Sequence, residues 1–196
     1  MSKLVWGVGF NDKTRPTWVD GKIVKEYDLW QSMLNRCFSE KFQTRQPTYK
    51  GCNVSDNFLN YNYFYDWCHK QVGFDNIDEK GRYWQLDMVL LFVGNKTYSE
   101  TTCVFVPQEI NKFFNEYGNA RGEYPLGVCF DKQKGKFKAY CRVNGKIRHL
   151  GYFDTPDEAY TVYKTFKENL CKQLALKWQS EIDPRLFDAM MIWSVY

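Results

Sequence analysis

Residues 127–160 constrain the fold most tightly, because they combine a strand-like alternation with a complete helix-start signal. Between positions 136 and 143 the apolar side chains alternate with polar ones and are Phe137, Ala139, Cys141 and Val143. A strand with this period of two buries one face and exposes the other. Further along, Thr155, Pro156 and Glu158 provide an N-cap, a proline at the first helical position and a capping-box glutamate. The stretch therefore predicts three short strands that run into a helix.

The predicted helix carries an apolar stripe whose members recur at steps of three and four residues: Ala159, Val162, Phe166, Leu170 and Leu174. Such a stripe packs against another apolar surface. We therefore expect it to cover one face of the three strands. The fold class that follows for this part is α+β, with a three-stranded antiparallel sheet packed on one helix.

The turn between the second and third strands is predicted at Asn144-Gly145, a pair that tolerates the positive φ values of tight turns. A two-residue turn would pair Val143 with Lys146. A three-residue loop would instead pair Val143 with Ile147 and would place Arg148 beside Arg142. We expect the three-residue loop, because it keeps the apolar and cationic faces separate.

The polar face of this sheet is expected to be strongly cationic. Residues 121–150 contain eight Lys or Arg side chains against two acidic ones, a net charge of +6, whereas the whole chain carries +4. The side chains expected on this face are Lys136, Lys138, Tyr140, Arg142, Lys146 and Arg148. Concentrated positive charge binds nucleic-acid phosphates by releasing counterions. The alternative is a solvated strand face whose lysines only prevent edge-to-edge aggregation.

Composition limits the class of protein. The chain has 196 residues, 44% of them apolar, which is enough for two small cores. It contains neither an apolar stretch of signal-peptide length near its start nor eighteen consecutive apolar residues. Its seven cysteines include no C-x-x-C pair, which argues against a disulfide framework and a zinc ribbon. We expect an intracellular, cytoplasmic protein with reduced cysteines and no membrane partner.

Residues 1–120 are predicted to form a separate domain, followed by a sheet domain at 121–178 and a helical tail at 179–196, with the first boundary near 119–123. Helices are expected at 27–42 and 58–72. The second is rich in aromatic residues, which either form a base-stacking platform or, as we expect, fill the core. The tail has a helix from about Pro184 to Trp193 whose apolar side chains must dock on the chain itself or on a partner. We expect docking within the chain.

The segment 83–117 is predicted to contain a strand at 83–91, a loop at 94–99, a second strand at 103–106 and a helix at 107–114. The helix opens at Pro107. Asp87, Asn95 and Asn111 are the polar side chains of interest here. Their structural alternatives are a strand-end carboxylate in a salt bridge, a turn residue and a helix-surface amide.

The sequence K-F-K-A-Y-C-R-V-N-G-K, followed by L-G-Y-F-D-T-P-D-E-A-Y, resembles the Apetala-type domain of plant ethylene-response transcription factors, which also occurs in phage and mobile-element nucleases and integrases. The resemblance implies a sheet laid into the major groove of DNA. Its strands would contact bases and phosphates through the positions matched here: Lys136, Lys138, Tyr140, Arg142, Lys146 and Arg148.

The order of elements in 83–117, with the upstream motif W-x-x-M-L-x-R-C-F, resembles the HNH homing endonucleases of bacteriophages and implies a degenerate ββα-metal domain. By this resemblance Asp87 and Asn111 would hold Mg²⁺ or Mn²⁺, Asn95 would orient the general base, and Met88 occupies the position of the base histidine. Methionine cannot accept a proton. The two histidines of the chain, His69 and His149, lie outside the motif.

These observations predict a double-stranded DNA-binding protein of phage type whose cleavage activity is weakened or lost. A first alternative is an active metal-dependent DNA endonuclease in which Lys96 or Tyr98 assists Asp87. A second alternative is a phage inhibitor of a host DNA-acting or defence protein in the bacterial cytoplasm. If cleavage is lost, no cofactor is required.

Overall fold

The chain folds as a mixed α+β protein in a computed structural model that describes residues 4–115, 123–143 and 145–195. It divides into two compact units, one comprising residues 1–111 with 180–186 and the other residues 112–179 with 187–196. Asn144 of the predicted turn, and all of the predicted 119–123 boundary except Glu123, lie outside the described residues.

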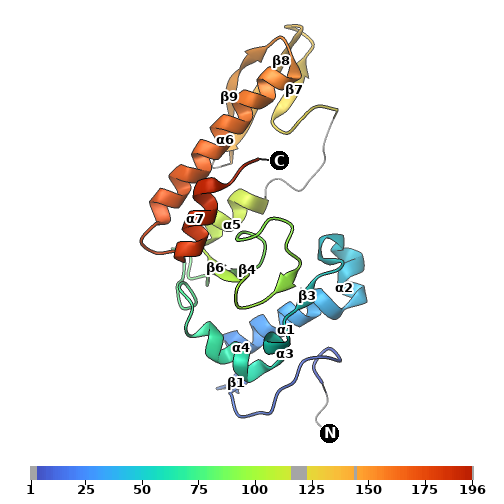
Figure 1. The fold of residues 1–196 in the computed structure, drawn as a ribbon, viewed down its shortest axis with the longest axis vertical. Helices are drawn as coiled ribbons and strands as arrows, with labels where there is room; N and C mark the ends of the chain where they lie inside the picture. The colour runs from blue at the N-terminus through green and yellow to red at the C-terminus, as the bar shows by residue number, and fades with distance from the viewer. Residues whose placement is uncertain (1–3, 116–122, 144, 196) are drawn as a thin grey trace. The chain divides into compact units, whose positions relative to one another are not determined.

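The first unit consists of helices and very short strands. In chain order these are β1 (Trp18–Val19), β2 (Lys22–Ile23), α1 (Lys25–Phe38), α2 (Glu40–Arg45), η1 (Pro47–Tyr49), β3 (Asn53–Val54), α3 (Asp56–Leu59), α4 (Tyr61–Cys68), β4 (Gln85–Asp87), β5 (Thr97–Tyr98), β6 (Val104–Val106) and the start of α5 (Gln108–Asn115). Helices α1 and α4 pack against each other (Figure 1).

Aromatic side chains fill the core of the first unit. Trp30 on α1 is fully buried, and its indole N–H donates a 2.7 Å hydrogen bond to the carbonyl of Phe58. The aromatic residues of α4 that are buried are Tyr61, Phe64 and Trp67. The expectation that the aromatic segment fills the core is therefore confirmed.

Both helices predicted in the first unit are interrupted by a residue that caps the next helix. Ser39 separates α1 from α2, and its hydroxyl accepts a hydrogen bond from the backbone N–H of Phe42. Asn60 likewise separates α3 from α4 and accepts from the N–H groups of Asn62 and Tyr63. The predictions of single helices at 27–42 and 58–72 were wrong because Ser and Asn stabilise a new helix start more than the interior of a helix.

In the segment 83–106 the first predicted strand, 83–91, is shorter than expected, and the predicted loop, 94–99, contains a short strand. β4 ends at Asp87, because its Oδ1 atom accepts the backbone N–H groups of Val89 and Leu90 and turns the chain. The predicted loop at 94–99 contains β5, which pairs in parallel with β3. β4 pairs antiparallel with β6, and α5 follows directly.

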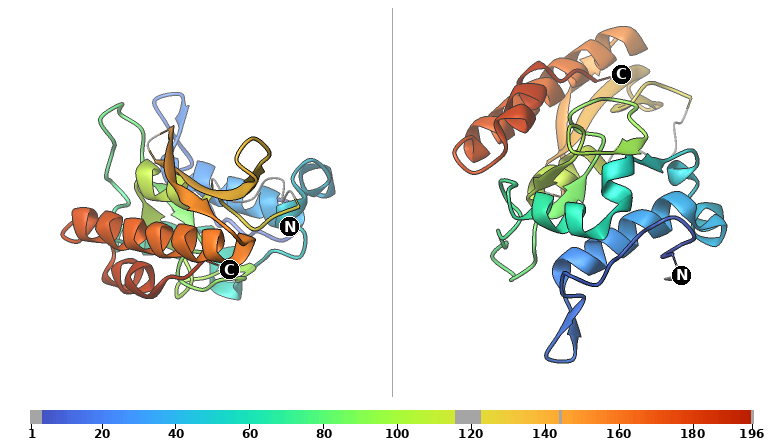
Figure 2. Two further views of the ribbon diagram at one scale, coloured as in Figure 1. Left: turned by 90° about the horizontal axis from the view of Figure 1, so that it is seen from above. Right: turned by 60° about the horizontal axis from the view of Figure 1, so that its bottom comes forward.

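The second unit contains the predicted sheet and helix. Its strands are β7 (Val128–Asp131), β8 (Lys136–Val143) and β9 (Lys146–Phe153), antiparallel in the order β7-β8-β9. Helix α6 (Pro156–Trp178) runs along one face of this sheet, as Figures 1 and 2 both show. Its capping box between Thr155 and Glu158 is present as predicted.

The buried line of α6 is rotated from the predicted stripe. It comprises Ala159, Tyr163, Lys167, Cys171 and Ala175, whereas the other predicted members are only half-buried. Lys167 is included because its ammonium lies 3.5 Å from the centre of the Phe113 ring, where a cation is stabilised by the aromatic face.

The C-terminal segment docks within the chain, as expected. Leu186 and Met190 of α7 (Pro184–Ile192) are buried, and Val195 packs with Cys141 and Tyr163 in the second unit. Within the first unit, Arg185 pairs with Asp183 at 2.8 Å. All seven cysteines are free thiols and six of them are buried. Among the described residues, none of the helices has the length and apolar character needed to cross a membrane.

Candidate nucleic-acid interface

The outer face of the three-stranded sheet is the face turned away from α6. Ala139 and Cys141 of β8 are buried against the core beneath the sheet. Because side chains alternate along a strand, the opposite face of β8 carries the intervening residues. These are four of the six predicted contact residues: Lys136, Lys138, Tyr140 and Arg142.

A bulge in β9 changes which residues of that strand join this face. Ala139 pairs with Gly151, but the next residue, Tyr140, pairs with His149, so Leu150 is the extra residue. Gly151 has a φ of 146°, a backbone conformation that other residues rarely adopt. Leu150 packs with both buried clusters beneath the sheet.

The pairing of Val143 with Lys146 is that of the two-residue turn, so the expectation of a three-residue loop was wrong, and the bulge returns residues 151–153 to the expected register. Val143 pairs with Lys146, and Cys141 pairs with Arg148, which places both cations on the face that α6 covers. The guanidinium of Arg148 accordingly lies 5.0 Å from the centre of the Phe166 ring on α6. The prediction that Lys146 and Arg148 share the outer cationic face was wrong, because residues 146–149 are shifted by one position from the expected register, which moves each of their side chains to the other face.

Three residues that sequence reasoning missed lie on the outer face instead. His149 is the cross-strand partner of Tyr140, and its ring lies 4.6 Å from that of Tyr152. The ammonium of Lys134, in the β7–β8 turn, lies 3.8 Å from the centre of the Tyr152 ring. The two-residue turn at 144–145 would have identified His149, because it pairs Val143 with Lys146 and hence Tyr140 with His149. The alternation after Gly151 could have identified Tyr152.

Two carboxylates adjoin these cations. Lys136 forms a 3.0 Å ion pair with Asp154, with side-chain exposures of 47% and 79%, so the pair is weak. Asp131 of β7 is the cross-strand partner of Lys136. Burial acts to raise the pKa of Asp131, but hydrogen bonds from the backbone N–H groups of Lys134 and Gln133 outweigh it and lower that pKa. The face therefore keeps an excess of cations at neutral pH.

A second cluster surrounds Asp87 in the first unit. Burial raises the pKa of this carboxyl group, while the N–H groups of Leu90 and Val89 and the charge of Arg36 act in the opposite direction. Arg36 on α1 also donates a 3.3 Å hydrogen bond to the hydroxyl of the buried Tyr98. Within the part of the chain that the structure describes, Asp87 forms no salt bridge, in contrast to the structural alternative considered for it. Arg36, which was not predicted, is its charged neighbour.

Asn95 holds the segment after Asp87 in place. Its Nδ2 donates to the carbonyls of Met88 at 2.6 Å and of Thr97 at 2.8 Å, and its Oδ1 accepts from the N–H of Thr97 at 3.2 Å. Asn95 is therefore a turn residue that also fixes the backbone of Met88. Met88 itself is 5% exposed and points into the core.

Asn111 lies over the same face of β4 as Asp87. Its side-chain amide donates to Gln85, which is two residues from Asp87 and therefore projects from the same face of the strand. Of the two residues proposed to assist, Tyr98 is buried, and the ammonium of Lys96 donates a hydrogen bond to the carbonyl of Thr48.

A divalent metal finds only a partial ligand set here. Asp87 has one carboxylate oxygen bound to two backbone N–H groups, and Asn111 supplies an amide, so waters and phosphate oxygens would have to complete an octahedral Mg²⁺ site. Among residues 4–115, 123–143 and 145–195, no group of three or more His, Cys, Asp or Glu side chains is arranged to hold a metal. His69 contacts Glu26 at 2.7 Å and the rings of Tyr65 and Phe74.

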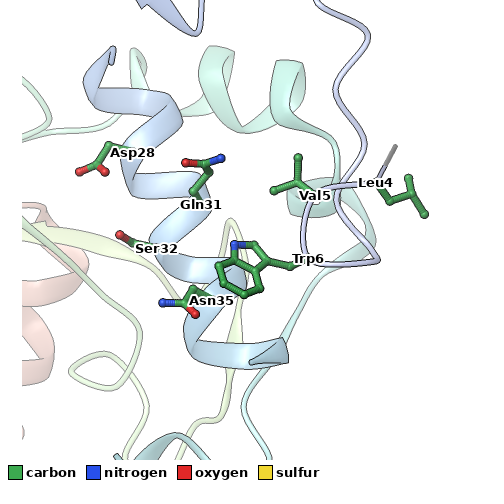
Figure 3. Close-up of a pocket in the computed structure, with 7 residues that line it drawn as sticks. All are labelled: Leu4, Val5, Trp6, Asp28, Gln31, Ser32 and Asn35. Carbon is green, nitrogen blue, oxygen red and sulfur yellow. The ribbon is translucent and has the colours of Figure 1, made fainter. Parts of the chain in front are cut away.

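An open cleft of about 500 Å³ lies between the N-terminal segment and α1. Figure 3 shows the indole of Trp6 beside Asn35, with Gln31, Ser32 and Asp28 further along α1. The described residues that line it include no Lys or Arg, so none of them offers phosphate a charge partner. The cationic sheet face and the Asp87 cluster are the arrangements that bear on function. No protein-family model, curated protein or solved structure matches this chain.

Proposed function

We propose that this protein binds double-stranded DNA through the outer face of β7, β8 and β9. The observation that carries the proposal is the row of Lys136, Lys138 and Arg142 on one strand, with Lys134 and His149 beside it. A ribbon of strands fits the major groove, where lysine and arginine contact phosphates and guanine edges. DNA is therefore the partner whose shape and charge match this face.

The aromatic residues of the face favour DNA over a merely solvated surface. Tyr140, His149 and Tyr152 lie among the cations and are not buried. Lysines that only prevent aggregation would need no such neighbours. Rings of this kind contribute apolar contacts with bases and sugars, in addition to the hydrogen-bonding capacity of the tyrosine hydroxyls.

We propose further that the first unit resembles phage HNH endonucleases and that its cleavage activity is weakened or lost. The antiparallel pair β4 and β6 followed by α5 has the strand, strand, helix order of the ββα-metal outline. Met88, at the general-base position, carries no proton acceptor and is buried. On this proposal a phage-type protein acts in the host cytoplasm by occupying DNA.

A pair of matched arginine variants tests the DNA interface. Arg142→Ala removes a cation from the outer face, whereas Arg148→Ala removes one from the face beneath the sheet. With a fluorescent 30-bp duplex over a series of salt concentrations, Arg142→Ala is expected to weaken binding and to reduce the slope of log K against log salt by about one. Arg148→Ala is expected to leave the slope unchanged.

Equal effects of the two variants would contradict the assigned interface. Retained binding by a variant with Lys138→Ala and Arg142→Ala together would do the same. Failure of the wild-type protein to bind any duplex would contradict DNA binding and would turn attention to a host protein as the partner.

A second candidate function, metal-dependent DNA cleavage, is favoured by the placement of Asp87, Asn95 and Asn111 around β4. With bound Mg²⁺ or Mn²⁺, Asp87 and Asn111 would provide the protein ligands, and the metal would supply charge stabilisation and an activated water. Supercoiled plasmid incubated with either metal measures this directly. Nicking that is lost in Asp87→Asn supports cleavage, and unchanged plasmid supports binding alone.

A further inference from the structure

Residues 89–93 form an apolar loop between β4 and β5 with the sequence V-L-L-F-V. Three of its side chains are strongly exposed: Val89 at 40%, Phe92 at 56% and Val93 at 62%. Single exposed apolar residues are ordinary, but several in succession at the tip of one loop indicate a contact surface.

The fold holds this loop firmly at both ends. On one side Asp87 accepts the N–H groups of Val89 and Leu90 at 2.7 and 2.9 Å. On the other side the Asn95 side chain bonds the carbonyl of Met88, and the N–H of Asn95 donates to the carbonyl of Phe92 at 3.0 Å. These hydrogen bonds hold the backbone of the loop in the conformation in which its apolar side chains are exposed.

Cations lie near the base of the loop. Arg36 is a charged neighbour of Asp87, and Lys96, three residues after Val93, donates to the carbonyl of Thr48 in η1 at 2.5 Å. The adjoining segment 36–50 contains four Lys or Arg residues against the single acidic Glu40, and three of these cations are exposed: Lys41, Arg45 and Lys50. The segments that adjoin the base of the loop thus carry more Lys and Arg than acidic residues, with Asp87 as the carboxylate at the base itself.

We propose that the apolar loop is a wedge that inserts between stacked base pairs of duplex DNA and kinks it. The proposal rests on the DNA-binding function proposed above and adds a second, chemically different contact. Apolar side chains that enter a base step partly unstack it, while neighbouring cations hold the flanking phosphates. The combination of an apolar tip and a cationic base fits DNA better than an apolar protein surface, which would leave those charges without partners.

Energy transfer between dyes at the two ends of a 30-bp duplex tests the wedge, since a kink brings the ends closer wherever the protein binds. The test variant is Phe92→Ser with Val93→Ser. The matched control is Ile192→Ser on α7, which removes an apolar side chain that is 84% exposed. Phe92→Leu retains an apolar tip and checks that the effect follows apolarity.

The wild-type protein, Ile192→Ser and Phe92→Leu are expected to raise the transfer efficiency on binding. The double serine variant is expected to lose that rise and to bind at least about tenfold more weakly, the loss expected when a buried apolar side chain is removed. Binding by the wild type without any rise would overturn the wedge and leave the sheet interface intact. A double serine variant that binds and kinks like the wild type would also overturn it, and an absence of DNA binding would overturn both proposals.

Discussion

Replacing Gly127 by alanine tests the packing that supports the sheet. Gly127 precedes β7, has a φ of 73°, and accepts a 2.8 Å hydrogen bond from the N–H of Tyr140. A Cβ atom built there would lie 2.1–2.5 Å from three ring atoms of the buried Tyr163 on α6. The left-handed backbone costs about 1–2 kcal/mol for a non-glycine residue, and overpacking costs about 1–3 kcal/mol more. We therefore expect Gly127→Ala to lower the free energy of unfolding by about 2–5 kcal/mol.

Gly135→Ala is the matched control. Gly135 also has a positive φ, of 61°, but its Cβ would meet no atom within 4 Å. The control is therefore expected to lose only the backbone contribution, about 1–2 kcal/mol. Urea unfolding followed by circular dichroism, together with amide exchange of the sheet, measures both variants. If Gly127→Ala is no less stable than Gly135→Ala, the contact between Gly127 and Tyr163 that we infer is absent.

Three further predictions concern single polar residues. Asp87→Asn keeps an acceptor for both backbone N–H groups but removes the charge that burial disfavours. Because burial raises the pKa of Asp87, the free energy of unfolding of the variant is expected to exceed that of the wild type by an amount that grows as pH rises from about 4. Urea unfolding at pH 3.5 and 7.5 measures this, and an equal difference at the two pH values would contradict it. Asn95→Ala removes three hydrogen bonds and is expected to cost about 2–4 kcal/mol and to speed amide exchange at 88–98. Asp154→Asn frees Lys136 and is expected to tighten DNA binding at low salt while changing stability by less than about 1 kcal/mol, and weaker binding in the duplex assay would refute this.

Sequence patterns predicted the sheet unit well wherever local chemistry decides the structure. The start of α6 depends on Thr155, Pro156 and Glu158, which act within one turn of the helix. The alternation along β8 likewise needs only its own residues. In contrast, the chain is interrupted at Ser39 and Asn60 because capping a new helix there is more stable than continuing the preceding one. Similar polar residues elsewhere remain inside a helix, so the residue type alone does not predict the interruption.

The face on which the side chains lie was predicted correctly for β8 and incorrectly for residues 146–149 of β9. The sequence left two turn lengths open, and the shorter one, which pairs Val143 with Lys146, is compatible with the rest of the sheet only because Leu150 forms a bulge and Gly151 adopts the required backbone conformation. Leu150 packs beneath the sheet, and such contacts across the unit leave no local periodicity. In the first unit, Asp87 and Asn111 were expected to lie together, and both do lie over one face of β4, but the neighbouring Arg36 is far away in sequence and carried no signal.

The bulge at Leu150 decides how much charge the outer face presents. The same residues could form a hairpin without the bulge, with a loop of residues 144–146, in which Arg142 would face Arg148 and Leu150 would pair with Tyr140. Lys146 and Arg148 would then replace Ile147 and His149 on the outer face without any substitution. The charge that the sheet presents is therefore set by the register of four residues, 146–149, and not by composition alone.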